Sequence, residues 1–317
     1  MKKRIAVLLA LVLALTCVLT ACGSASATKM TMGTGGSAGT YYAFGGVLGQ
    51  HINEKTGISV NVVTTDGSKA NILGVDAGNY QLATVQSDVM AYAWEGSRSF
   101  EEEGAIDSFR VVGGLYAEAV QLITMDPAIK SVADLAGKKV SIGAAGSGVY
   151  FNAVDVLTAA GLSEADIVPQ YQSFADSADA LKDGKIDAAF IVAGAPTPAI
   201  TELCTTTDAY LVPIDGEVAE ALMASCPFYT TYDIPAGTYD GQTEDVTTVT
   251  VKATMIVSAS ASEEDVYNLT KAIFEDPSAI AHAKAAELSI ENATSGMTAP
   301  FHAGAAKYFA EKGVTVE

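Results

Sequence analysis

The sequence is poor in positive charge. It has 18 lysines and arginines against 37 aspartates and glutamates, and its formal net charge is −19. Arginine is especially scarce, because Arg4, Arg98 and Arg110 are the three copies in the chain. A surface of this charge repels nucleic acids and anionic lipid headgroups and favours solubility. We therefore expect no nucleic-acid partner.

Long apolar runs are absent after the first 21 residues; spanning a bilayer takes about 20 apolar residues. The N-terminus has Lys2, Lys3 and Arg4, an apolar segment over 5–18, and then Leu19-Thr-Ala-Cys22. This order is typical of a secretory signal, and its end is similar to a bacterial lipobox. We predict a signal peptide over 1–21, a lipid on Cys22 and a tether over 22–28. The body would then be extracytoplasmic and held to the bacterial cell membrane through the lipid anchor only. An ordinary signal cleaved nearby and a short membrane anchor are the alternatives.

Cysteine and histidine are scarce as well. The chain has four cysteines and three histidines, without a CxxC motif or a histidine–cysteine cluster, so we expect no metal site and no cofactor. Cys17 would leave with the signal and Cys22 would carry the lipid. The remaining Cys204 and Cys226 are compatible with a disulfide in an exported protein, or with two separate buried thiols.

Glycine, in contrast, is concentrated in two similar turns. Gly33-Thr-Gly-Gly-Ser-Ala-Gly39 follows a predicted strand and precedes a helix that begins near Thr40, and Gly143-Ala-Ala-Gly-Ser-Gly148 has the same setting. Glycines let a backbone approach a ligand closely, and a helix N-terminus presents unpaired N–H groups. Each turn is therefore a candidate anion site, or a tight turn without a ligand. Two of them predict two walls that face one ligand.

Strands and helices alternate along the chain, which predicts an α/β fold with mainly parallel sheets and flanking helices. Two β-rich runs, 111–124 and 247–257, are too long for ordinary strands. We expect each to cross between two lobes. Lobe 1 would comprise 29–116 plus 255–317, and lobe 2 would comprise 117–254. The length of the chain is sufficient for two cores.

Ligands of open α/β sheets bind outside the carboxyl ends of the strands. Both glycine turns, the segment 86–88 and the segment 193–196 fall at such ends. The cleft between the lobes is therefore the predicted site. Its candidate ligand-binding residues are Gly35, Gly36, Ser37, Gly39, Thr40, Tyr41, Tyr42, Ser68, Gln86, Ser87, Ser147, Gly148, Asn152, Ala195 and Pro196.

The scarcity of arginine limits the donors available to an anionic ligand. Arg98 lies in a polar loop beside the acidic residues 101–103, where we expect a solvated ion pair. A carboxylate would instead be held by backbone N–H groups of both turns, by the Ser147 hydroxyl and by the Gln86 amide.

Four other side chains near the predicted cleft have expected roles. One of Tyr41 and Tyr42 would cover the ligand, while the other packs in the core. Asp88 is expected to cap a helix. Glu118 lies on a crossing strand among apolar residues, so it should be paired or lie at a hinge.

A series of short motifs extends over nearly the whole chain after the signal. They are Gly33-Thr-Gly-Gly-Ser-Ala-Gly-Thr-Tyr-Tyr42, Gln86-Ser-Asp88, Leu115-Tyr-Ala-Glu118, Gly146-Ser-Gly148, the segment 177–190, Gly194-Ala-Pro-Thr-Pro198, the segment 234–239 and Pro300-Phe-His-Ala-Gly-Ala305. In this order and spacing they are similar to the TAXI-type solute receptors of tripartite ATP-independent periplasmic (TRAP) transporters. One departure is Val149, where the family usually has threonine.

The resemblance implies a type II periplasmic-binding fold that captures a small organic anion or amino acid, with glutamate and 2-oxoglutarate as typical ligands. It also implies delivery to a TRAP-type permease driven by an ion gradient. A monomer is the default for this architecture.

A secreted enzyme acting on a small anionic substrate in the same cleft is the alternative. An esterase elbow would need glycine where Ala145 and Val149 stand, and none of the three histidines has an evident serine or aspartate partner. The segment 33–38 matches a loose dinucleotide pattern, which is a weak signal by itself. A lipid-anchored adhesin would explain export but not two ligand turns. We expect a binding protein and not an enzyme.

Overall fold

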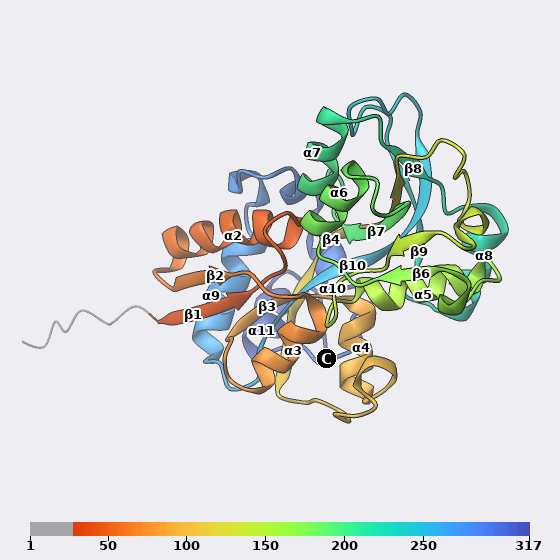
Figure 1. Ribbon diagram of the computed structural model, residues 1–317. Coiled ribbons are helices and arrows are strands. Elements are labelled where there is room, and N and C mark those ends of the chain that lie inside the picture. The colour runs from red at the N-terminus through yellow and green to blue at the C-terminus, as the bar shows by residue number, and fades with distance from the viewer. Residues whose placement is uncertain (1–27) are drawn as a thin grey trace, which may run out of the picture.

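The computed structural model describes residues 28–317 (Figure 1). The predicted signal peptide, Cys22 and most of the tether lie outside the described residues. The strands are β1 (Lys29–Gly33), β2 (Ser59–Val63), β3 (Leu82–Gln86), β4 (Phe109–Thr124), β5 (Lys139–Ser141), β6 (Val168–Gln170), β7 (Ala188–Ala193), β8 (Tyr210–Val212), β9 (Thr230–Ile234) and β10 (Val246–Ser258).

Helices follow most of these strands. They are α2 (Thr40–Thr56), α3 (Ser68–Asp76), α4 (Ser87–Glu95), α5 (Val149–Ala159), α6 (Phe174–Lys182), α7 (Pro198–Thr206), α8 (Gly216–Ser225), α9 (Glu263–Phe274), α10 (Ile290–Thr294) and α11 (Ala303–Glu311). Short 3₁₀ helices are η1 (Arg98–Phe100), η2 (Val132–Leu135), η3 (Glu164–Asp166), η4 (Pro277–Ala279) and η5 (Ala283–Glu287). Within 28–317, no helix has both the length and the apolarity needed to cross a membrane.

The strands form one mixed sheet in the order β2-β1-β3-β10-β4-β7-β5-β6, with β8 on β4 and β9 on β10. Pairing is parallel within β2-β1-β3 and within β6-β5-β7, and antiparallel where β4 and β10 join them. Figure 1 shows β10, in light blue, running from the part that contains β8 and β9 to the part that contains β3. The predicted α/β fold with two long connecting strands is confirmed.

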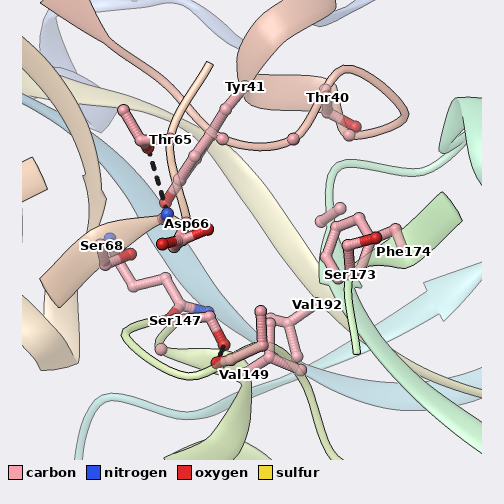
Figure 2. A pocket seen from close by; sticks show the side chains of 18 of the residues that line it. Thr40, Tyr41, Thr65, Asp66, Ser68, Ser147, Val149, Ser173, Phe174 and Val192 are labelled. Atoms are coloured by element: carbon pink, nitrogen blue, oxygen red, sulfur yellow. Dashed lines mark hydrogen bonds between the residues drawn. The ribbon is translucent and has the colours of Figure 1, made fainter. Parts of the chain in front are cut away.

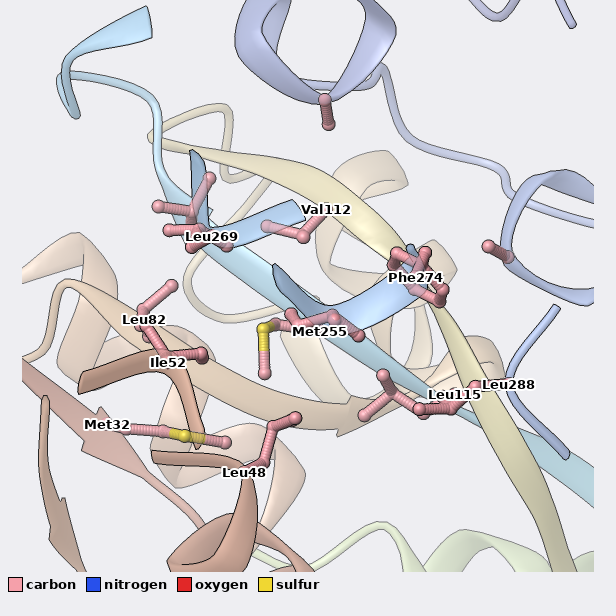
Figure 3. Packing of buried hydrophobic residues seen from close by; sticks show 14 of the residues in the cluster. Met32, Leu48, Ile52, Leu82, Val112, Leu115, Met255, Leu269, Phe274 and Leu288 are labelled. Atoms are coloured by element: carbon pink, nitrogen blue, oxygen red, sulfur yellow. The ribbon is translucent and has the colours of Figure 1, made fainter. Parts of the chain in front are cut away.

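The buried apolar side chains form separate clusters along this sheet. Two clusters draw on the chain up to Tyr116 and again from Ala253 onward, and two draw on Ala119 to Val251. Figure 3 shows the first of them, in which Leu48 and Ile52 of α2 share one core with Leu269 and Phe274 of α9. The sheet is therefore continuous, but the clusters fall into two sets, one on each half of it. Strands β4 and β10 contribute residues to both sets.

Helix α2 follows the first glycine turn and packs closely on the sheet. Phe44, Leu48 and Ile52 repeat every four residues and are fully buried, as an amphipathic helix requires. Gly45 shares their face, and a Cβ there would lie 2.8 Å from the Thr34 Cγ2 atom. Glycine on the inner face therefore sets the distance between α2 and the sheet.

Gly46, one residue further along α2, is exposed, and a Cβ added there would meet nothing within 4 Å. Gly46→Ala should raise the free energy of unfolding by about 0.5–1 kcal/mol, because alanine loses less conformational entropy in a helix. Gly45→Ala should lower it by about 1 kcal/mol or more, because overpacking outweighs that gain. Urea unfolding of both variants measures the difference, and equal effects would contradict the close packing of α2.

The possible disulfide between Cys204 and Cys226 is wrong, because both residues are buried free thiols. Cys204 belongs to α7 and packs in the cluster that contains Ile200 and Leu203. Cys226 follows α8, packs in a different cluster, and has its Sγ atom 3.7 Å from the Tyr92 hydroxyl. The two thiols are thus held apart in two cores, and burial raises the pKa of both.

Candidate functional site

A cavity of about 390 Å³ lies where the two glycine turns meet. Its lining comes from both ends of the sheet: Gly35, Gly36, Ser37, Gly39, Thr40, Tyr41, Thr64, Thr65, Asp66, Gly67, Ser68, Gln86, Glu118, Ala144, Ser147, Gly148, Val149, Gln172, Ser173, Phe174, Val192 and Ala193. Figure 2 shows Tyr41 extending from α2 toward the side where Asp66 and Ser68 lie, with Ser147 and Val149 on the facing wall. We refer to this cavity as the central pocket.

Ten of the candidate residues line the central pocket, and five do not. The five are Tyr42, Ser87, Asn152, Ala195 and Pro196. Tyr42 does not pack in the core, contrary to expectation, but is 38% exposed, because one step along a helix turns a side chain by about 100°. The Ser87 hydroxyl accepts from the Lys252 backbone N–H. Ala195 and Pro196, joined by a cis peptide bond, lie just beyond the last lining residue of β7.

The first turn leads directly into the N-terminus of α2. Gly39 is the N-cap residue and makes no side-chain cap, so the first N–H groups of α2 have no acceptor supplied by a cap. The Thr40 hydroxyl donates to the Gly194 carbonyl at 2.7 Å, which ties the turn to the end of β7. The pocket wall thus offers backbone N–H donors and the positive end of a helix dipole. The Thr40 hydroxyl proton is not available to a ligand, because it is donated to Gly194.

The second turn is folded back on itself. Gly143 and Gly146 have φ of 92° and 84°, which a side chain would disfavour. The Ser147 hydroxyl donates to the Ala144 carbonyl at 2.7 Å, so it stabilises the turn and does not point a free proton at a ligand. The Gly146 carbonyl accepts from the Lys69 N–H at 3.1 Å, which joins this turn to the start of α3.

Glu118, from β4, lies in the pocket wall and is 1% exposed. The Tyr41 hydroxyl donates to its Oε2 atom at 2.7 Å. Burial raises the pKa of the Glu118 carboxyl well above its ordinary value, and burial together with the nearby carboxyl raises the pKa of Tyr41. Glu118 is therefore paired, as expected, and the hydroxyl proton of Tyr41 is donated to it and not to a ligand.

Behind the pocket, Gln86 begins a chain of hydrogen bonds between α4 and α5. Its Nε2 donates to Asn152 Oδ1 at 2.8 Å, and Asn152 Nδ2 donates to Asp88 Oδ2 at 2.9 Å and to the Tyr229 hydroxyl at 2.7 Å. Asn152 thus does not line the pocket itself but holds the side chain of Gln86, which does. The hydroxyl of Ser68 accepts from the Gln86 backbone N–H at 3.1 Å, so both the backbone and the side chain of Gln86 are held by hydrogen bonds.

Asp88 does not cap α4, contrary to expectation. The helix begins at Ser87 with Gln86 as its N-cap and no side-chain cap. Asp88 is fully buried, and burial is the main reason why its pKa rises to about 6, against the opposing hydrogen bond from Asn152. Asp88 lies inside the first turn of α4. Its carboxyl therefore accepts a hydrogen bond from Asn152 and does not cap the helix.

Arg98 pairs with a different partner from the one expected. Its Nη2 lies 2.6 Å from Asp155 Oδ1 of α5, and its Nη1 also donates to the Tyr92 hydroxyl. The residue has a φ of 49°, uncommon for a side-chain-bearing residue. Sequence neighbours suggested the acidic loop 101–103, but the fold brings α5 within reach. No lysine, arginine or histidine of residues 28–317 lines the central pocket.

Sequence reasoning missed a large share of the lining. Thr64, Thr65, Asp66 and Gly67 follow β2, and Gln172, Ser173 and Phe174 follow β6. Both groups obey the same rule about carboxyl ends of strands that located the glycine turns. Ala144 and Ala193 lie within segments that were already singled out, Val149 and Val192 lie next to them, and Glu118 was noted without being placed in the pocket. The signal was therefore present for most of them.

Comparison with known proteins supplies the family. The model of the NMT1-like family matches residues 32–313, which is most of the chain. The chain belongs to the NMT1-like family. Among solved structures it is similar to the alkanesulfonate-binding protein SsuA from Xanthomonas axonopodis pv. citri bound to MOPS. That match has 18% identity over 90% of this chain and 85% of that one, with a TM-score of 0.50.

A second solved structure agrees with the first. A protein from Bordetella bronchiseptica RB50 matches with 17% identity over 92% of this chain and 84% of that one, at a TM-score of 0.55. Similarity at this level establishes a shared fold. This member of the NMT1-like family thus has the α/β fold of type II periplasmic-binding proteins.

Proposed function

We propose that this protein is an extracytoplasmic solute-binding lipoprotein that captures a small organic anion or amino acid in the central pocket and delivers it to a TRAP-type permease. The observation that carries the proposal is the pocket itself. It is about 390 Å³ in volume, a size suited to a small molecule, and both glycine turns contribute to its walls. The resemblance of the sequence motifs to TAXI-type receptors supports the permease partner.

We also propose that the two sets of clusters are lobes, with the bounds given by the sequence, and that β4 and β10 are the connections about which they close. Hydrogen bonds and an ion pair already join the two sets. Examples are the Thr40–Gly194 and Gln86–Asn152 hydrogen bonds and the Arg98–Asp155 ion pair. Closure on a ligand would add to such contacts.

The enzyme alternative lacks a catalytic arrangement in the pocket. No histidine of the described chain lines it, and the Ser147 hydroxyl donates to a backbone carbonyl and not toward a base. Nucleophilic catalysis needs a nucleophile and a base in hydrogen-bond reach. His302 instead has its Nδ1 atom accepting from the Gly304 N–H at the start of α11. The late Pro-x-His-x-Gly motif is thus explained as a helix start.

Thermal unfolding of the chain without its signal segment tests the proposal. The panel is L-glutamate, L-glutamine, 2-oxoglutarate, C4-dicarboxylates, and sugars as controls. A true ligand at 100 times its Kd should stabilise the protein by about 2.7 kcal/mol, and sugars should not. Native mass spectrometry on the same sample detects a ligand that is already bound. No shift with any compound and no bound small molecule would contradict a role as a solute receptor.

A further inference from the structure

The ionisable side chains of the central pocket are all acids or tyrosine. They are Glu118, Asp66 and Tyr41, and no cationic side chain of residues 28–317 joins them. The buried Lys284 is not among the lining residues; its Nζ atom is bonded to Glu287 Oε1 at 2.7 Å, and its charge lowers the pKa of Glu118 against the larger effect of burial. Within the same range, Glu118 has no ion pair. The lining of the pocket within these residues thus offers carboxyl groups and no cationic side chain.

An independent observation concerns Gln86, which lines the pocket and is 2% exposed. Its Oε1 atom has no hydrogen-bond partner in the described chain. The orientation of its amide follows from the network behind it, because Asn152 gives its Nδ2 protons to Asp88 and so offers Oδ1 to Gln86 Nε2. The oxygen of Gln86 is therefore left for another donor.

The facing wall repeats this feature. Gln172 also lines the pocket, and its Oε1 atom is buried without a partner among residues 28–317. Buried acceptors are normally satisfied in native structures, so unpartnered ones on residues that line a cavity point to donors on the ligand. An ammonium group has three donors and no acceptor, which suits a wall of carboxylate and amide oxygens.

We propose that the central pocket takes a ligand with a positively charged amino group, which lies against Glu118 and the free amide oxygens, and with at most one carboxylate. The inference rests on the proposed function and narrows its ligand class. One carboxylate has a place at the N-terminus of α2, where the helix dipole amounts to about half a positive charge. A second carboxylate would meet Glu118 and Asp66 with no cation to balance it. Zwitterionic or cationic amino compounds are therefore favoured over dicarboxylates such as 2-oxoglutarate.

Matched ligand pairs that differ in one amino group test this on the unaltered protein. Calorimetry compares L-glutamine with glutaramate and L-arginine with 5-guanidinovalerate, which lack only the α-amino group, and L-glutamate with 2-oxoglutarate, in which a ketone replaces the amine. We expect measurable binding in at least one of the first two pairs, with at least tenfold loss of affinity when the α-amino group is absent. Binding of 2-oxoglutarate or succinate as tight as that of the amino compounds would overturn the inference and leave the receptor function standing.

Glu118→Gln provides the second test. It should weaken binding of the best amino ligand by about tenfold more than binding of its deamino partner. Glu164→Gln is the matched control, because Glu164 also accepts from a tyrosine, Tyr150 at 2.8 Å, but lies outside the pocket lining. Equal affinity of the Glu118 variant and the control would overturn the inference. If neither protein bound any compound and native mass spectrometry found none, the receptor function would fail with it.

Discussion

Gly148→Val is expected to weaken ligand binding by about a hundredfold and to lower the free energy of unfolding by about 2–3 kcal/mol. A Cβ at Gly148 would overlap the Gln86 Oε1 atom and lie 2.7 Å from Val89 Cγ2. Gln86 cannot swing aside freely, because its Nε2 is bonded to Asn152. Any accommodation therefore breaks that hydrogen bond or fills the cavity.

The measurement is calorimetric affinity for the best compound of the panel, together with urea unfolding. Gly36→Ala is the control, because Gly36 also lines the pocket, has nothing within 4 Å of an added Cβ, and does not have a left-handed φ. That variant should change stability by less than about 0.5 kcal/mol. A valine variant with the stability and affinity of the parent protein would show that Gly148 does not shape the pocket.

Asp88→Asn is expected to stabilise the protein at pH 7.5 by up to about 3 kcal/mol. In the folded state the pKa of Asp88 rises from 3.8 to about 6, mainly because the carboxyl is buried, and nearby Asp155 adds to the rise. Between these values the folded state binds more protons than the unfolded state, so stability falls as the pH rises from about 4 to about 6. The difference between the two pKa values corresponds to about 3 kcal/mol.

Asparagine retains an acceptor for Asn152 and carries no charge, so the advantage of the variant should largely vanish at pH 4. Thermal unfolding at pH 4 and pH 7.5 measures it. Asp134→Asn is a control of opposite sign. Asp134 accepts from the Lys130 and Ser131 N–H groups, which lower its pKa, so this variant should lose stability at pH 7.5 and less at low pH. If Asp88→Asn destabilised the protein at pH 7.5, the prediction would be wrong, because the hydrogen bonds to the buried carboxylate would then outweigh the cost of its burial.

Local patterns in the sequence were sufficient for the architecture and for the walls of the pocket. Glycine at 35, 36, 39 and 148 follows strands and precedes helices, and these short-range features require no knowledge of distant contacts. The rule that ligands bind at carboxyl ends of strands also covers the missed segments after β2 and β6. Whether these residues bind a ligand stays a prediction that the panel tests.

Other features depend on residues that are far apart in the chain. The Tyr41–Glu118 hydrogen bond joins residues 77 positions apart, and the Gln86–Asn152 bond joins residues 66 positions apart. No periodicity encodes such pairs, because they form only when β4, α2 and α5 pack around one cavity. The same reason explains the partner of Arg98 and the separation of Cys204 from Cys226, since each side chain takes the neighbour that packing provides.

By itself, the sequence determined the α/β fold, the two long strands and the place of the two glycine turns between strands and helices. These follow from hydrophobic alternation and from backbone freedom, which act over a few residues. Tertiary structure alone decided the charge of the pocket. It buried Glu118 against Tyr41, left the side-chain oxygens of Gln86 and Gln172 without a hydrogen-bond partner in the described chain, and kept every cationic side chain of residues 28–317 out of the lining. The physical reason is that charge complementarity depends on which side chains share a cavity, and the packing of distant segments sets that.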